Sequence, residues 1–136
     1  MLFQVVSMLR KRLGIEAIER DWDLHYYLSN HYFKIPSTLI ISESCEKIGK
    51  FAFYECDRLK EVVISGSVKE INIDAFYNCT NLRQVIISRG VEWIGISAFY
   101  NCEKAVIILE KAKKEFEYIG SEAFRGCRDV KEKART

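Results

Sequence analysis

The sequence predicts an α/β solenoid in which a short strand and a short helical or 3₁₀ turn recur along one chain. Three observations predict it. The chain repeats itself with a period of 23 residues, the spacing of apolar residues changes midway through each copy, and residues 1–36 do not repeat. A unit of one turn and one strand cannot bury its own apolar face, whereas stacked copies of it can.

Size and composition limit the classes of protein that fit. The 136 residues allow one domain, and 49% hydrophobic against 29% charged residues is ordinary for a globular protein. The net charge of +2 is already supplied by residues 128–136, so we expect no basic surface for nucleic acid. No apolar run approaches a membrane span of ~20 residues. Five cysteines without a secretory signal favour free thiols and an intracellular, reducing or assembly-associated location.

The repeat is clearest where Ala-Phe-Tyr-Asn-Cys occurs twice, at 75–79 and 98–102. Isoleucine, alanine, phenylalanine and cysteine keep this step in three copies, and a fourth copy follows after a step of 25. Cys45 falls where other copies carry valine, so we expect a small buried hydrophobe there. We expect two columns in one shared core, namely Phe53, Phe76, Phe99 and Phe124, and Cys56, Cys79, Cys102 and Cys127.

Within each copy the apolar spacing indicates two kinds of local structure. From Ile48 through Phe53 to Leu59 the apolar residues lie three or four apart, which is a helical or 3₁₀ rhythm. Val62 and Ile64 then alternate with other residues, as in a strand that turns one face inward.

Two consecutive segments, IGKFAFYECDRLKEVVISGSVKEI and INIDAFYNCTNLRQVIISRGVEWI, resemble BspA-type leucine-rich repeats. The resemblance covers about residues 37–130, in about four copies. Ser65 and Ser88 replace the family's proline after the strand, and Asn72 replaces a glycine. The resemblance implies a curved solenoid with a parallel sheet on the concave face and short helical turns outside.

The third copy departs from the pattern in CEKAVIILEKAKKEFEYIG. Counted by the period, Glu110 takes the place of Ile64 and Ile87, so we expect a strand near 106–109 and then a local helical excursion. The last copy has Lys133 where a strand valine is expected. We therefore predict that the sheet stops there and that the charged tail 128–136 shields its end.

Residues 1–36 are expected to form a helical cap, and residues 37–136 the repeats. Terminal units of solenoids are atypical because they cover an open core. The alternative is a helix that docks on a partner or on a membrane surface, or that mediates self-association. His25 and His31 lie in this segment without a ligand at metal-binding spacing, so we interpret them as surface or cap residues.

The cysteines are the most reactive side chains in the repeats, and their spacing favours a structural role. Zinc sites place ligands close together, as in C-x₂₋₄-C pairs, and the chain contains none. Buried, un-ionised thiols are poor nucleophiles and poor ligands. No phosphate loop, nucleophile elbow or zincin motif occurs. We therefore predict a protein that is not an enzyme and that needs no metal or cofactor.

The outward residues of the strands suggest a function. A contiguous apolar stripe on neighbouring strands is a candidate contact surface, although β-branched residues also favour strands for their own sake. With the resemblance, this predicts a non-enzymatic scaffold that binds a protein or peptide on the concave sheet. The alternative is a structural subunit of a larger assembly, such as a surface or virion component, joined through the amino-terminal helix or the sheet ends. The predicted contact residues are Ile40, Val63, Ile86 and Leu109, with Glu61, Gln84, Ser65 and Ser88 as a polar rim.

Overall fold

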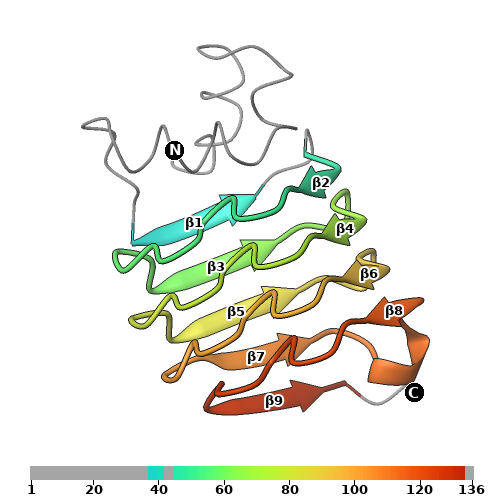
Figure 1. The fold of residues 1–136 in the computed structure, drawn as a ribbon. Helices are drawn as coiled ribbons and strands as arrows, with labels where there is room; N and C mark the ends of the chain where they lie inside the picture. Colours follow the sequence, from blue (N-terminus) through green and yellow to red (C-terminus); the bar gives the residue numbers. More distant parts are fainter. Residues whose placement is uncertain (1–36, 42–44, 134–136) are drawn as a thin grey trace.

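The computed structural model describes residues 37–41 and 45–133. These residues form a stack of coils, each of which contributes one longer and one shorter strand (Figure 1). The expected amino-terminal cap, with His25 and His31, lies outside the described residues. No helix in the described part of the chain is long and apolar enough to cross a membrane.

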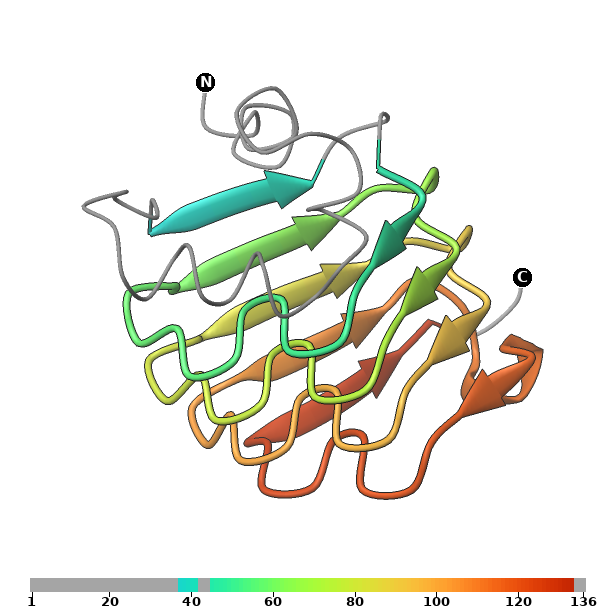
Figure 2. The same cartoon turned by 45° about the horizontal axis from the view of Figure 1, so that its top comes forward.

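The longer strands form a five-stranded parallel sheet, and the shorter strands form a four-stranded parallel sheet (Figure 2). Because longer and shorter strands alternate along the chain, neighbouring strands in each sheet are two apart in chain order. The five-stranded sheet contains, in spatial order, β1 (Thr38–Ile41), β3 (Glu61–Ile64), β5 (Gln84–Ile87), β7 (Val106–Leu109) and β9 (Asp129–Glu132). The four-stranded sheet contains β2 (Lys47–Ile48), β4 (Glu70–Ile71), β6 (Trp93–Ile94) and β8 (Tyr118–Ile119).

The sheet does not stop before the charged tail, so that prediction is wrong. Strand β9 pairs in parallel with β7, and Val130 lies opposite the inward residue Ile107. The alignment by period looked for the strand three positions too late, because Val130 and not Lys133 takes the inward place of Val62. Lys133 instead follows the strand, and its backbone N–H donates to the carbonyl of Leu109 at 3.0 Å.

The segments expected to be helical are successive tight turns. Among the described residues, seven non-glycine residues and Gly126 have positive φ, and they recur at two places in each coil. One of these places is occupied by Glu55, Asn78, Asn101 and Gly126. A left-handed residue cannot continue an α-helix, so two turns in succession produce the spacing of three and four. The expectation of short helical turns is wrong for these segments.

The turns also form a third hydrogen-bonded ladder between coils. The N–H of Phe53 donates to the carbonyl of Ala75, and the N–H of Phe76 donates to the carbonyl of Ala98, both at 2.7 Å. The same bond recurs from Phe99 to Ala123 at 2.8 Å. In an ordinary loop, backbone N–H and C=O groups form hydrogen bonds with water. Here they bond to the next coil instead, so the side chains between them can be buried.

The excursion after β7 contains one short 3₁₀ helix, Lys113–Glu115, the only helix in the described part of the chain. It returns Phe116, which is 7% exposed, to the inward position that Val91 holds one coil earlier. Lys111 is also buried, with its ammonium 4.6 Å from the Phe116 ring and 3.2 Å from Glu92 Oε1. The longer third coil thus fills its interior with a larger apolar side chain, Phe116, and with the paired cation Lys111.

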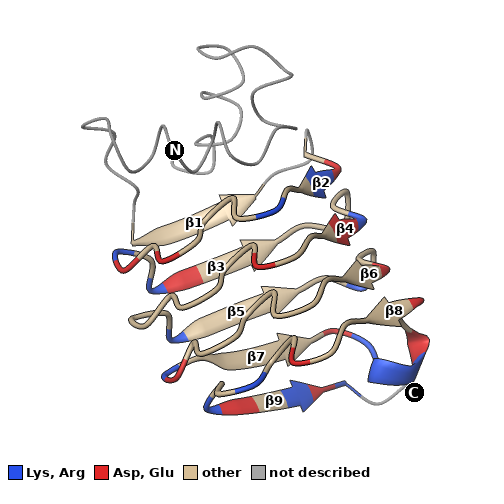
Figure 3. Cartoon of the chain, viewed as in Figure 1, with Lys and Arg blue, Asp and Glu red and all other residues tan. Residues whose placement is uncertain are grey.

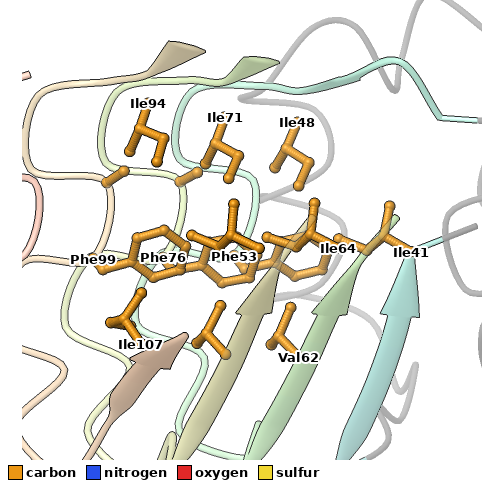
Figure 4. Packing of buried hydrophobic residues seen from close by; sticks show 14 of the residues in the cluster. Ile41, Ile48, Phe53, Val62, Ile64, Ile71, Phe76, Ile94, Phe99 and Ile107 are labelled. Atoms are coloured by element: carbon orange, nitrogen blue, oxygen red, sulfur yellow. The ribbon is translucent and has the colours of Figure 1, made fainter. Parts of the chain in front are cut away.

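The core is built from columns of equivalent side chains (Figure 4). The rings of Phe53 and Phe76 stack with centroids 5.1 Å apart, and Phe76 stacks on Phe99 at 5.0 Å. Phe124 continues the column at 5.9 Å from Phe99 and is partly exposed at the end. The predicted phenylalanine column is therefore present, and the isoleucines of both sheets pack around it.

Candidate interaction surface

The outer face of the five-stranded sheet carries a continuous row of aliphatic side chains. Ile40 lies beside Val63, Val63 beside Ile86, and Ile86 beside Ile108 in the parallel register. Ile40 is 42% exposed, and the other three are partly exposed. We call Ile40, Val63, Ile86 and Ile108 the apolar stripe. Adjacent strands place its side chains about 4.8 Å apart, so the four form one surface.

Leu109 does not belong to this surface, contrary to prediction. Its exposed fraction is 0%, and it lies opposite the buried residue Ile87. The step from β5 to β7 is one residue shorter than the period, because Gln84 pairs with Val106. A shift of one residue exchanges the two faces of a strand. Ile108 therefore takes the outward place that was assigned to Leu109.

The four residues predicted as a polar rim lie in two settings, two on the strands and two in the turns. Glu61 and Gln84 occupy the neighbouring outward column, where Glu61 Oε1 accepts a hydrogen bond from Thr38 at 3.2 Å. Ser65 and Ser88 lie in the turns after the strands. The Ser65 hydroxyl is 2.9 Å from the Ser67 hydroxyl, and both serine side chains are partly buried. Ser65 thus contributes to the turn as well as to the rim.

Charged residues bound the stripe at one end. Ile108 lies beside Lys131 of β9, and Asp129 precedes it on the same outward face. Figure 3 shows the acidic and basic residues of β9 at the end of a sheet whose β1 and β5 carry no charge. Glu132 occupies an inward position of this edge strand, opposite Leu109. Charges on an edge strand, above all inward ones, oppose the addition of another strand.

The cysteine side chains form a column of hydrogen-bond donors. The thiols of Cys79 and Cys102 donate to the carbonyls of Phe53 and Phe76 at 3.1 Å, and Cys127 donates to Phe99 at 3.2 Å. Their role in the coils is therefore to satisfy backbone carbonyls that face the core. Within the described ranges, no group of three or more His, Cys, Asp or Glu residues is arranged to hold a metal ion.

Cys56, at the first position of this column, is held in its neutral form. Burial, followed by the charge of Asp57, raises the pKa of its thiol to about 12. A thiolate is the form that attacks electrophiles or binds metals, so a raised pKa makes this cysteine unreactive at neutral pH. Cys45 is 4% exposed and its thiol donates to the carbonyl of Lys47 at 3.3 Å. The expectation of a small buried residue at that position is confirmed.

Two outward aromatic columns escaped the sequence reasoning. Tyr54, Tyr77 and Tyr100 stack along the turns with successive centroids 5.0 Å apart. Trp93 and Tyr118 stack on the four-stranded sheet with centroids 4.6 Å apart. The tyrosines follow the phenylalanines directly in the first three copies and share their step, so the signal was present in the repeat.

The carboxy-terminal end of the stack is open. In each earlier coil, alternate N–H groups of the turn donate to the following coil, as those of Ser97, Phe99 and Asn101 do. The equivalent groups in the last coil belong to Glu122, Phe124 and Gly126, and among the described residues they have no acceptor. The core column is open there too, since Phe124, Cys127 and Val130 are only partly buried.

A sequence model of the BspA type leucine rich repeat region matches residues 27–133 in six copies. The match starts before residue 37 and counts more copies than the four recognised in the sequence. No curated protein and no solved structure matches the chain. The matched residues include every strand described above, and their parallel solenoid agrees with a leucine-rich-repeat fold. The chain belongs to the family of BspA type leucine-rich-repeat proteins.

Proposed function

We propose that this protein is a non-enzymatic interaction scaffold, and that it binds a protein or peptide through the apolar stripe on the five-stranded sheet. Leucine-rich repeats form a scaffold often used for protein interactions, which supports the class of function. The observation that carries the assignment is the unbroken register of Ile40, Val63, Ile86 and Ile108 across four strands.

The chemistry of the stripe supports a partner with an apolar contact surface. β-Branched and aliphatic side chains on neighbouring strands provide a rigid apolar centre, and Glu61 and Gln84 provide a polar border. The outward positions of Val63 and Ile86 contribute little to the core. A substitution at Val63 or Ile86 therefore changes the outer surface with little effect on the core, whereas Val62 and Ile87 are buried in it.

The test is a comparison of affinity capture from the native source. The bait is the wild-type chain, the double variant Val63→Asp/Ile86→Asp or the single variant Arg58→Asp, and bound proteins are identified by mass spectrometry. Arg58→Asp is a matched control because it changes the net charge as much as the double variant does, at an exposed residue that lies in neither sheet. The proposal expects a partner that is retained by the wild type and by Arg58→Asp and lost with the double variant. Partners that all bind the double variant at wild-type levels contradict it.

A structural subunit of a larger assembly is the second candidate. The specific observation in its favour is the open carboxy-terminal end, with three N–H donors and a partly exposed core column. Contact through the amino-terminal helix predicted from the sequence is the other proposed route. Light scattering at several protein concentrations tests this candidate. A mass that rises with concentration supports assembly, and a strict monomer at all concentrations contradicts it.

A further inference from the structure

The outer side of the four-stranded sheet presents a second apolar surface, separate from the apolar stripe. Trp93 and Tyr118 lie side by side on β6 and β8, and their rings stack. Tyr118 is 37% exposed, and Ile96, which follows β6, is 42% exposed. These are two of the three large hydrophobic side chains that are most exposed in the described part of the chain. Ile73 precedes Ile96 by one coil and is partly exposed.

Close packing of the backbone holds these side chains outward. A Cβ atom on Gly95 would lie 2.6 Å from the backbone nitrogen of Ile73, and one on Gly120 would lie 2.4 Å from that of Ile96. Both distances are too short for a real contact, so the coils touch backbone to backbone at the glycines. The side chains on either side of each glycine therefore border a flat strip. We call Ile73, Trp93, Ile96 and Tyr118 the Trp93 surface.

The acidic residue Asp74 lies next to this surface, and it has no ion-pair partner in the part of the chain that the structure describes. Asp74 follows Ile73 directly, and its N–H donates to the carbonyl of Ile96 at 3.1 Å. Among the described residues no cation lies within ion-pair distance of its carboxylate. Burial raises the pKa of the Asp74 carboxyl above its ordinary value, because the surrounding chain excludes part of the water from the charge. A cationic group placed there would gain an ion pair with a partly desolvated carboxylate.

Five carboxylates lie on or next to the strands and turns that carry the Trp93 surface. Three of its neighbours are already paired, namely Glu70 with Lys47, Glu92 with Lys111, and Glu122 with Arg125. Asp74 and Glu117, at opposite ends of the surface, are not paired within the described ranges. Two unpaired carboxylates flanking an apolar centre complement a ligand that has positive charge and apolar side chains together.

We propose that the Trp93 surface is a second docking site, and that its occupant is a basic and apolar peptide segment of a partner protein. A basic side chain of the segment pairs with Asp74, and its apolar side chains cover Ile73, Ile96 and Trp93. Tyr118 lies on the last strand of its sheet, and no other described residue stacks on the far face of its ring. That face suits the flat guanidinium of an arginine beside Glu117.

A sugar is a poorer fit to the same residues. The facing sides of the Trp93 and Tyr118 rings cover each other at 4.6 Å, so a sugar would compete for the same outer face of Tyr118 that suits the guanidinium, and it would bring no cation to Asp74 and Glu117. Carbohydrate binding is therefore an outcome of the test that would overturn the proposal.

The experiment measures the binding of three capped hexapeptides to the full chain by isothermal titration calorimetry. The probes are alternating Arg-Leu, alternating Glu-Leu and alternating Arg-Ser; a linear glucose hexasaccharide is added as the sugar probe. We expect the Arg-Leu peptide to bind at least about tenfold more tightly than either other peptide, because only it offers both charge and apolar area. Its affinity should fall as salt is raised.

Matched variants assign the binding to the surface. Asp74→Asn should weaken binding of the Arg-Leu peptide by about tenfold. Asparagine tolerates the positive φ of this position, as Asn78 and Asn101 do in the same turns, so the variant keeps the fold. Asp57→Asn, the same change at an exposed residue elsewhere in the coil, should leave the affinity unchanged.

The outcomes separate this proposal from that for the apolar stripe. Unchanged binding with Val63→Asp/Ile86→Asp, together with loss in Asp74→Asn, supports a second site. Loss with the stripe variant alone places the peptide on the other sheet and overturns the proposal. Equal affinity for the Arg-Leu and Glu-Leu peptides, binding of the hexasaccharide instead, or no binding of the Arg-Leu peptide at about 1 mM overturns it as well.

Discussion

The rings of Phe76 and Phe99 stack with their centroids 5.0 Å apart and their planes only 3° from parallel. Such a nearly eclipsed pair is set by the backbone, because the parallel ladders place equivalent residues directly over each other in successive coils. Each phenylalanine therefore fills its own coil and also covers the next. The stability of the solenoid depends on contacts between coils more than on contacts within one.

This arrangement predicts a gradient along the phenylalanine column. Phe76→Ala removes a ring that is covered on both faces, so it should lower the free energy of unfolding by about 3–5 kcal/mol. Phe124→Ala, at the partly exposed end, should cost less than half as much. Urea denaturation of both variants measures the two losses. Equal losses would mean that the end of the stack is as well covered as its centre.

The close contact between coils predicts different effects at two glycines. Gly95→Ala forces a Cβ against the backbone of Ile73, which cannot move without shifting a coil, and should cost about 1–3 kcal/mol. At Gly66 the nearest atom is the hydroxyl oxygen of Ser88 at 3.2 Å, a side chain that can rotate. Gly66→Ala is therefore the control and should change stability little. Thermal unfolding of the pair decides the matter, and a harmless Gly95→Ala would disprove the close approach.

The left-handed positions predict a stabilising substitution. Glu55 has a φ of 54°, where later coils carry Asn78, Asn101 and Gly126. Asparagine is favoured over glutamate in this region, so Glu55→Asn should raise the free energy of unfolding by up to about 1 kcal/mol. Glu103→Asn removes an equally exposed carboxylate at a residue without positive φ and should not stabilise. If both variants change stability alike, the gain comes from charge rather than from the backbone.

The thiol of Cys56 predicts a loss of stability in alkali. Its pKa in the fold is about 12 against an ordinary value of 9.0, so the folded state holds this proton more tightly than the unfolded chain. The resulting stabilisation is complete below the unfolded pKa and is lost as the pH rises from about 9 toward 12. The destabilisation caused by Cys56→Ala should therefore be smaller at about pH 10.5 than at about pH 7.5. A pH-independent difference between variant and wild type would contradict the shift.

Sequence periodicity was sufficient for the core and insufficient for two strands, since it missed β9 and misjudged the facing of β7. The phenylalanines are found by their constant step, because a column needs only that equivalent residues recur. The strand 106–109 was also correctly located. The face to which each of its side chains points was not predicted correctly, because the stretch between Cys102 and the strand is one residue shorter than in the earlier copies. The run Ala-Val-Ile-Ile-Leu at 105–109 has no polar member to show which side faces water.

The turns were mistaken for a helix for a related reason. Spacings of three and four arise both from an α-helix and from two turns in succession, and only the backbone angles distinguish them. A hint was present, since Asn precedes Cys79 and Cys102 and Gly precedes Cys127. These are the residues that best accept a left-handed conformation.

The outward facing of Ile108 is the relationship on which the unbroken stripe depends, and comparing Ile108→Asp with Leu109→Asp by urea denaturation tests it most directly. Leu109 is fully buried beside Ile87, so a carboxylate there should unfold the chain or cost more than about 4 kcal/mol. Ile108 is partly exposed, and Ile108→Asp should fold with a loss of about 1 kcal/mol. The reverse order, with Leu109→Asp tolerated and Ile108→Asp unfolded, would contradict both the register of β7 and the stripe.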